Sequence, residues 1–83
     1  MTHNELYSRM IDDINLIASR YVGFENNKPN QTKLNNDMKL ILNFYKLLLA
    51  DVITNESVSA SLLEDGNIQL KFSPVIQEWY NNR

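Results

Sequence analysis

The apolar residues of this chain are most concentrated between residues 38 and 53. Beginning just before this stretch, one row of apolar side chains recurs at alternating steps of four and three, namely Leu34, Met38, Ile41, Tyr45, Leu48 and Val52. This spacing predicts a helix over residues 33–53 that lies along another helix. Two further rows flank the first, one formed by Leu40, Phe44 and Leu47 and the other by Leu42, Leu49 and Ile53. Because the three rows cover roughly two thirds of the helix circumference, this helix needs covering elements on at least two sides.

A second helix with the same period is predicted earlier, over residues 3–22. Its apolar row consists of Tyr7, Met10, Ile14, Ile17, Tyr21 and Phe24. Thr2 and Glu5 have the spacing of a capping box, in which the two side chains satisfy free amides of the first helical turn. Asn4 is the competing cap. Gly23 can adopt the left-handed conformation that commonly ends a helix.

A polar linker over residues 24–31 separates the two predicted helices. It contains Pro29, which disfavours a helical conformation at Lys28, so Asn30 or Thr32 is expected to cap the second helix. Since the connection is short and both helices carry matching apolar rows, we expect them to pack as an antiparallel pair.

From residue 57 onward the period of the apolar residues changes to two, which predicts a β-hairpin over residues 57–63 and 67–72. A two-residue Asp-Gly turn would place serines opposite Leu70 and Phe72. A three-residue loop with a left-handed Gly66 instead places apolar residues opposite one another, in the pairs Leu62 with Ile68, Ala60 with Leu70 and Val58 with Phe72. We therefore expect the three-residue loop, because an isolated hairpin is marginal in water and needs one apolar face to pack on the helices.

The end of the chain predicts a short helix over residues 74–81, with Ser73 as cap and Pro74 in the first turn. Together these elements predict an α+β fold in a single small domain over residues 1–83. In this fold an antiparallel pair of long helices is followed by a β-hairpin and a short C-terminal helix, both packed on the second helix.

Composition is typical of a soluble globular chain, since 43% of the 83 residues are hydrophobic and 22% are charged. Cysteine is absent, no basic-then-apolar segment precedes a small-residue cleavage site, and no uncharged apolar run approaches the ~20 residues of a membrane span, so we expect neither a secretory leader nor a membrane span. We therefore expect a cytoplasmic protein without disulfides. The twelve asparagines and three arginines are typical of an AT-rich coding sequence, such as that of a phage or a low-GC bacterium, so the cytoplasm could be that of a bacterium or of an infected host cell.

The polar residues suggest neither catalysis nor metal or cofactor binding. His3 is the only histidine and lies at the chain terminus, and the two glycines cannot build a phosphate-binding loop. Asp12 and Asp13 point ~100° apart on a helix, so they do not converge on one ligand. We expect a protein that is not an enzyme and has no catalytic residue, metal or cofactor.

Two surfaces remain as candidates for binding. Aromatic side chains dominate interface hot spots, so the first hypothesis is a protein-binding module that acts as inhibitor, accessory factor or regulatory subunit of a larger protein. Its candidate contacts are Tyr7, Tyr21, Phe24, Trp79 and Tyr80. A homodimer would use the same apolar surplus.

The alternative is a nucleic-acid-binding regulator resembling a winged helix. Amide and ammonium groups contact phosphates and base edges, and the second helix carries a stripe of them at Asn35, Asn36, Lys39, Asn43 and Lys46. The net charge of −2 and the scattered basic residues count against this alternative. So does the lack of room for a short recognition helix before the hairpin.

Overall fold

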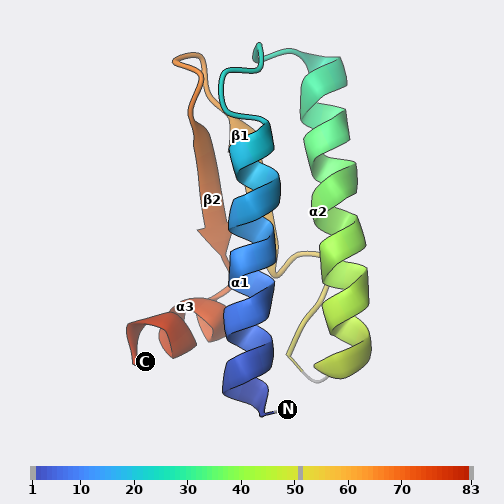
Figure 1. Cartoon of the computed structure of the whole chain (residues 1–83), viewed down its shortest axis with the longest axis vertical. Coiled ribbons are helices and arrows are strands. Elements are labelled where there is room, and N and C mark those ends of the chain that lie inside the picture. The colour runs from blue at the N-terminus through green and yellow to red at the C-terminus, as the bar shows by residue number, and fades with distance from the viewer. Residues whose placement is uncertain (1, 51, 83) are drawn as a thin grey trace.

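The computed structural model describes residues 2–50 and 52–82 of the chain. The elements are α1 (His3–Arg20), α2 (Lys28–Leu48), β1 (Val58–Leu62), β2 (Ile68–Phe72) and α3 (Pro74–Asn81). The predicted α+β class, with two long antiparallel helices followed by a hairpin and a short helix, is confirmed. The hairpin covers one face of the helix pair, and α3 crosses the end at which both termini lie (Figure 1).

Helix α1 begins at the predicted capping residue. The Glu5 amide donates to the Thr2 hydroxyl at 3.2 Å, and that hydroxyl donates to the Glu5 carboxylate at 3.3 Å. The helix ends at Arg20 instead of residue 22, because the Tyr21 amide bonds the Ala18 carbonyl at 3.0 Å and tightens the last turn. Gly23 follows with a φ of 88°, in the left-handed region as predicted.

Helix α2 begins at Lys28, earlier than the predicted residue 33. Asn27 is the cap instead of Asn30 or Thr32, since its side chain accepts a hydrogen bond from the Asn30 amide at 2.9 Å. The prediction that Pro29 keeps this segment out of the helix was wrong. Proline is tolerated in a first helical turn, where the missing N–H would have no partner within the helix.

Helix α2 also ends earlier than predicted, at Leu48 instead of Ile53. Leu49 leaves the helical conformation, and its carbonyl accepts from the amides of Val52 at 3.1 Å and Ile53 at 2.9 Å. This turn brings Ile53 into the core, where it is fully buried. Burial at the turn thus outweighs the local preference for helix, while Asp51, within the predicted helix, lies outside the described residues.

The hairpin adopts the predicted register. Val58 pairs with Phe72, Ala60 with Leu70 and Leu62 with Ile68, and Gly66 has a φ of 87° in the connecting loop. The hairpin loop also touches the loop between the helices, because the Gly23 amide donates to the Gly66 carbonyl at 2.8 Å. A Cβ at Gly66 would lie at an ordinary contact distance of 3.5 Å from the Gly23 Cα, and one at Gly23 would meet nothing within 4 Å. Glycine is therefore favoured at both positions by the positive φ and not by lack of space.

Helix α3 has the predicted bounds but differs from the prediction in its capping hydrogen bond and in its neighbours. Ser73 precedes the helix without making a side-chain cap bond, while its amide donates to the Ser57 carbonyl at 2.7 Å. The helix was expected to pack on α2. Because the chain enters it directly from β2, its main contact is with that strand, and Trp79 reaches back to α1.

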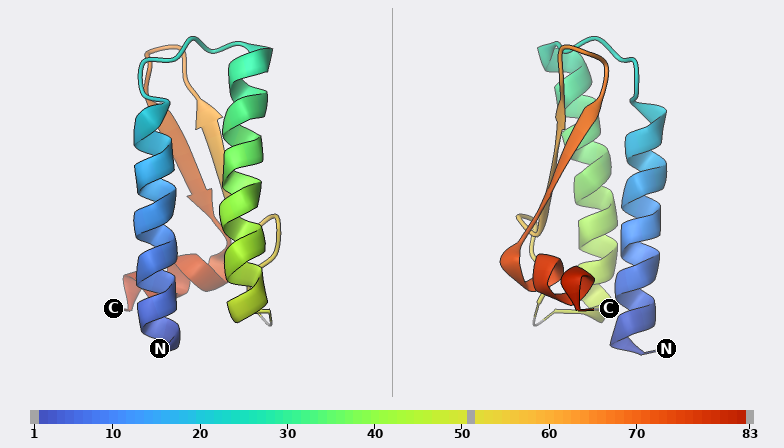
Figure 2. Two further views of the ribbon diagram at one scale, coloured as in Figure 1. Left: turned by 45° about the vertical axis from the view of Figure 1, so that its right-hand side comes forward. Right: turned by 90° about the vertical axis from the view of Figure 1, so that its left-hand side faces the viewer.

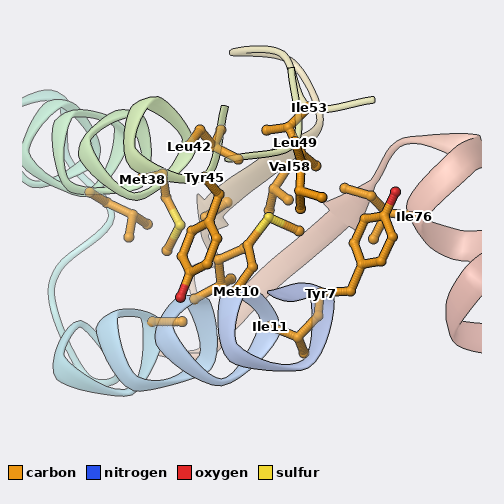
Figure 3. Close-up of a cluster of buried hydrophobic side chains, with 14 of the residues drawn as sticks. Tyr7, Met10, Ile11, Met38, Leu42, Tyr45, Leu49, Ile53, Val58 and Ile76 are labelled. Atoms are coloured by element: carbon orange, nitrogen blue, oxygen red, sulfur yellow. The ribbon is translucent and has the colours of Figure 1, made fainter. Parts of the chain in front are cut away.

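The core lies between the two long helices, the inner face of the hairpin and α3. Its largest fully buried apolar side chains are Met10, Ile14, Leu34, Leu42, Ile53 and Ile76. Tyr7 and Ile76 lie side by side at the end nearest α3, and the Tyr45 hydroxyl points from α2 towards α1 (Figure 3). All five elements therefore contribute side chains to one packed interior, in which the outer face of the hairpin takes no part.

Candidate partner-binding surface

One row of apolar side chains on α2 is left uncovered by the fold. This row consists of Leu40, Phe44 and Leu47. Leu48 was predicted to pack along the other helix but is 49% exposed, so that part of the prediction was wrong. Together with Leu16 of α1, these residues form what we call the outer helical face, namely Leu16, Leu40, Phe44, Leu47 and Leu48. Exposed fractions in this set run from 49% to 83%. Since β1 packs against the Met38 and Leu42 side of α2, the helical period places the outer helical face on the opposite side, away from the hairpin.

A groove runs along this face between the two helices. Its volume is about 300 Å³, and it is lined by Asp13, Leu16, Ile17, Leu40, Ile41, Phe44 and Tyr45. Along α2 the exposed residues Leu40, Phe44 and Leu47 recur at steps of four and three. This is the spacing by which one helix packs along another, so the groove has the pattern that a further helix would fill.

The aromatic residues predicted to bind a partner are not gathered on one surface. Tyr7 and Tyr21 are buried, with 7% and 8% of their surface exposed. The Trp79 ring lies 5.0 Å from the Tyr7 ring, and its indole N–H donates to the Asn4 side chain at 2.7 Å. Three of the five aromatics thus contribute to the fold.

The two exposed aromatics lie at opposite ends of the molecule. Phe24, 41% exposed, follows α1 and packs on the Tyr21 ring at 4.9 Å, whereas Tyr80, 47% exposed, lies on α3. The loop after α1 and helix α3 are separated along the longest axis (Figure 1). These two rings therefore cannot form a single contact patch.

The polar stripe of the alternative hypothesis is exposed throughout. All of its members, Asn35, Asn36, Lys39, Asn43 and Lys46, lie on α2 with exposed side chains. The stripe runs between the outer helical face and the side of α2 that contacts β1. It contributes two positive charges, and the Asn35 side chain accepts a hydrogen bond from Gln31 at 2.8 Å.

Two tyrosine–aspartate hydrogen bonds join the long helices. Tyr45 of α2 donates to Asp13 of α1 at 2.6 Å, and Tyr21 at the end of α1 donates to Asp37 of α2. The sequence analysis considered Asp13 only beside Asp12 and predicted neither pair. The available signal was that Asp13 borders the apolar row of its helix, within reach of a polar ring tip on the neighbouring helix.

These hydrogen bonds change the acidity of both hydroxyls. Burial, followed by the hydrogen bond to Asp13, raises the pKa of Tyr45 from 10.0 to about 12. The hydrogen bond to Asp37, followed by burial, raises the pKa of Tyr21 as well. The neutral hydroxyl is therefore the stable form of both tyrosines across the physiological range.

The Tyr45 pair predicts a loss of stability in alkali. A pKa raised on folding contributes stability that is complete below pH 10 and is lost as the pH rises towards 12. Because the hydroxyl meets Asp13 close to solvent, we expect about 1–2 kcal/mol to be lost over this window. Urea unfolding at several pH values should show a shallower loss for Tyr45→Phe than for the wild type. An equally steep loss in the variant would contradict the assignment.

Other site types find no support among the described residues. Residues 2–50 and 52–82 contain no group of three or more histidine, aspartate or glutamate side chains arranged to hold a metal ion. Within the same residues, no helix has the length and apolar character needed to cross a membrane.

Comparison with protein-family models, curated proteins and solved structures finds no match for this chain. Its function therefore has to be inferred from its own surface.

Proposed function

We propose that this chain is a small non-enzymatic protein-binding module that acts in the cytoplasm as inhibitor, accessory factor or regulatory subunit of a larger protein. The observation that supports the proposal is the outer helical face. Because Tyr7 and Tyr21 are buried, the proposal replaces the predicted aromatic contacts with the residues of the outer helical face, namely Leu16, Leu40, Phe44, Leu47 and Leu48.

The size of the face fits an interface. At roughly 150–250 Å² for a large side chain, five side chains exposed by 49–83% present on the order of 500 Å² of apolar surface. A standard interface buries about 800 Å² per partner, of which about 60% is apolar. The apolar part of such an interface, about 500 Å², is therefore of the same order as the area of this face.

The total surface area supports the same proposal. A monomer of 9.7 kDa is expected to expose about 5,100 Å², whereas this chain exposes 5591 Å². The chain thus exposes more surface than a compact monomer of its mass.

The partner that fits this face best is an amphipathic helix. The spacing of Leu40, Phe44 and Leu47 and the groove against Leu16 and Ile17 provide a seam for a helix that presents its own apolar row. Bound there, the helix would complete a three-helix layer over the side of α1 and α2 that the hairpin leaves open.

Capture experiments with matched variants test the proposal. From nuclease-treated lysate of the natural host, the tagged wild type should retain one protein in stoichiometric amount. Phe44→Lys should weaken that complex roughly tenfold or more, as expected for an aromatic hot spot. Because Phe44 is 58% exposed, the variant should keep the helical circular dichroism of the wild type.

The double variant Lys39→Gln/Lys46→Gln is the control, since it alters the polar stripe and leaves the outer helical face intact. It should capture the same protein. If Phe44→Lys captures the protein as well as the wild type does, the outer helical face is not the contact surface. If instead binding appears only when nucleic acid is left in the lysate, falls steeply with rising salt and is abolished in the lysine variant, the nucleic-acid alternative is supported.

A further inference from the structure

The register of the hairpin determines which backbone groups of β2 face away from β1. Antiparallel strands alternate between residue pairs that exchange hydrogen bonds and pairs that do not. Ser57 with Ser73, and Leu63 with Asn67, are joined by backbone hydrogen bonds of 2.7 and 2.9 Å. Hydrogen-bonded pairs recur at every second residue, so Lys71 and Gln69 also belong to such pairs. Ile68, Leu70 and Phe72 belong to the pairs that do not exchange hydrogen bonds, so their N–H and C=O groups point outward from the hairpin.

The corresponding outward groups of β1 confirm this geometry. The Gln31 side chain of α2 donates to the Ala60 carbonyl and accepts from the Leu62 amide, both at 2.9 Å. One side-chain amide thus occupies the place of a neighbouring strand, and α2 covers the edge of β1.

The edge of β2 has no such cover. Among the described residues, no hydrogen bond is made by the outward backbone groups of Ile68, Leu70 and Phe72. In the right-hand view of Figure 2, β2 lies in front of β1 and no other element lies in front of β2. The five-residue strand carries one charge, Lys71, and lacks a proline, a bulge or an inward-pointing charge that would blunt the edge further.

We propose that the edge of β2 pairs with β2 of a second copy of this chain, antiparallel about Leu70. The residue numbers of each facing pair then add up to 140, so Leu70 faces Leu70 of the other copy and Ile68 faces Phe72 of the other copy. All three outward pairs exchange hydrogen bonds in this register. The two hairpins become one continuous four-stranded sheet with the helices of both copies on the same side.

The side chains suit this two-fold arrangement. Ile68, Leu70 and Phe72 share the inner face of the sheet with the buried residues of β1, yet each is only half-buried. Pairing with a second copy removes more of their apolar surface from water. On the outer face Gln69 lies opposite Lys71 of the other copy, so no like charges meet. The net charge of −2 adds little repulsion between copies.

Amide hydrogen exchange measured by NMR on the full chain, from micromolar to millimolar concentration, tests this inference. The amides of Ile68, Leu70 and Phe72 should become protected as concentration rises and light scattering reports a dimer. The amides of Gln69 and Lys71 are the internal control, because they already bond β1 and should exchange at a rate independent of concentration.

Two substitutions at one exposed position add a quantitative test. Gln69→Lys places like charges opposite each other twice in the dimer and should weaken it roughly twofold to thirtyfold. Gln69→Glu places opposite charges there and should tighten it by a similar factor. Since Gln69 faces Ser61 within the hairpin, both variants should keep the stability of the monomer.

Two results would overturn the inference. One is a chain that stays monomeric at millimolar concentration. The other is a dimer in which exchange at Ile68, Leu70 and Phe72 does not change. If Phe44→Lys abolishes that dimer, the two copies meet through the outer helical face. This result would contradict the proposed strand pairing, but it would be compatible with the proposed protein-binding role of the outer helical face.

Discussion

Replacing Leu42 by alanine is expected to lower the free energy of unfolding by about 2–5 kcal/mol, whereas replacing Leu47 by alanine should change it by less than about 0.5 kcal/mol. Both are leucines of α2, but Leu42 is 1% exposed and Leu47 is 83% exposed. Alanine at Leu42 leaves a cavity between α2 and β1, while alanine at Leu47 removes only solvated surface. A chain of 83 residues is expected to have about 4–12 kcal/mol of stability in total, so the first variant should be severely destabilised.

Urea unfolding followed by circular dichroism measures both changes. The same two variants should have the opposite ranking in partner capture. Leu47→Ala weakens the proposed complex while remaining folded, and Leu42→Ala binds in proportion to its folded fraction. A large loss of stability from Leu47→Ala would show that the outer helical face is covered within the monomer.

This pair of leucines shows where sequence reasoning about the site reaches its limit. The pattern identified two apolar rows flanking the seam of α2, and chemically the rows are alike. The structure covers the row of Leu42, Leu49 and Ile53 and leaves the row of Leu40, Phe44 and Leu47 exposed. The choice depends on the side from which the hairpin approaches, and periodicity within one helix carries no information about that approach.

Features that depend on counting along the chain were predicted correctly. The hairpin register follows from requiring apolar residues on one face, and Gly66 follows from the loop length that this register demands. The cap at Thr2 and the bounds of α3 likewise depend on neighbouring residues alone. Local rules were not sufficient at the start of α2, where Asn27 is the cap and Pro29 lies within the helix.

Contacts between distant residues could not be predicted in this way. The Asn4 and Trp79 side chains, the Tyr45 and Asp13 pair and the Gly23 and Gly66 loops meet only after the elements have packed. The aromatics were grouped as one contact set because their type is common in interfaces. Three of them instead contribute to the fold, since burying a large ring stabilises a small domain as well as it stabilises a complex.

Replacing Gln31 by alanine is expected to lower the free energy of unfolding by about 2 kcal/mol, although Gln31 is a polar residue near the start of a helix. The substitution leaves the Ala60 carbonyl and the Leu62 amide without their partner at a half-buried edge. An orphaned buried group costs about 1–3 kcal/mol, and water admitted to the edge offsets part of the loss. Urea unfolding measures the change, and faster exchange of the Leu62 amide should accompany it.

Two further variants separate the strand contacts from other effects. Asn35→Ala removes the 2.8 Å hydrogen bond between the Gln31 and Asn35 side chains. It keeps both contacts of Gln31 with β1, so the free energy of unfolding should stay within about 0.5 kcal/mol of the wild type. Gln31→Glu keeps an acceptor for the Leu62 amide but sets a carboxylate oxygen against the Ala60 carbonyl. It should therefore lose stability while Leu62 stays protected, and fast exchange in this variant would contradict the assigned bond.

The Gln31→Ala variant should also change how copies associate, because it opens the second edge of the hairpin. Among the described residues of the wild type, the edge of β2 is the only free edge of the hairpin, so the proposed pairing between copies ends at a dimer. With the edge of β1 also free, each copy has two edges, and pairing can continue from copy to copy. Light scattering should then show species larger than a dimer at concentrations where the wild type shows none. A variant that stays dimeric at these concentrations would show that α2 alone protects the edge of β1.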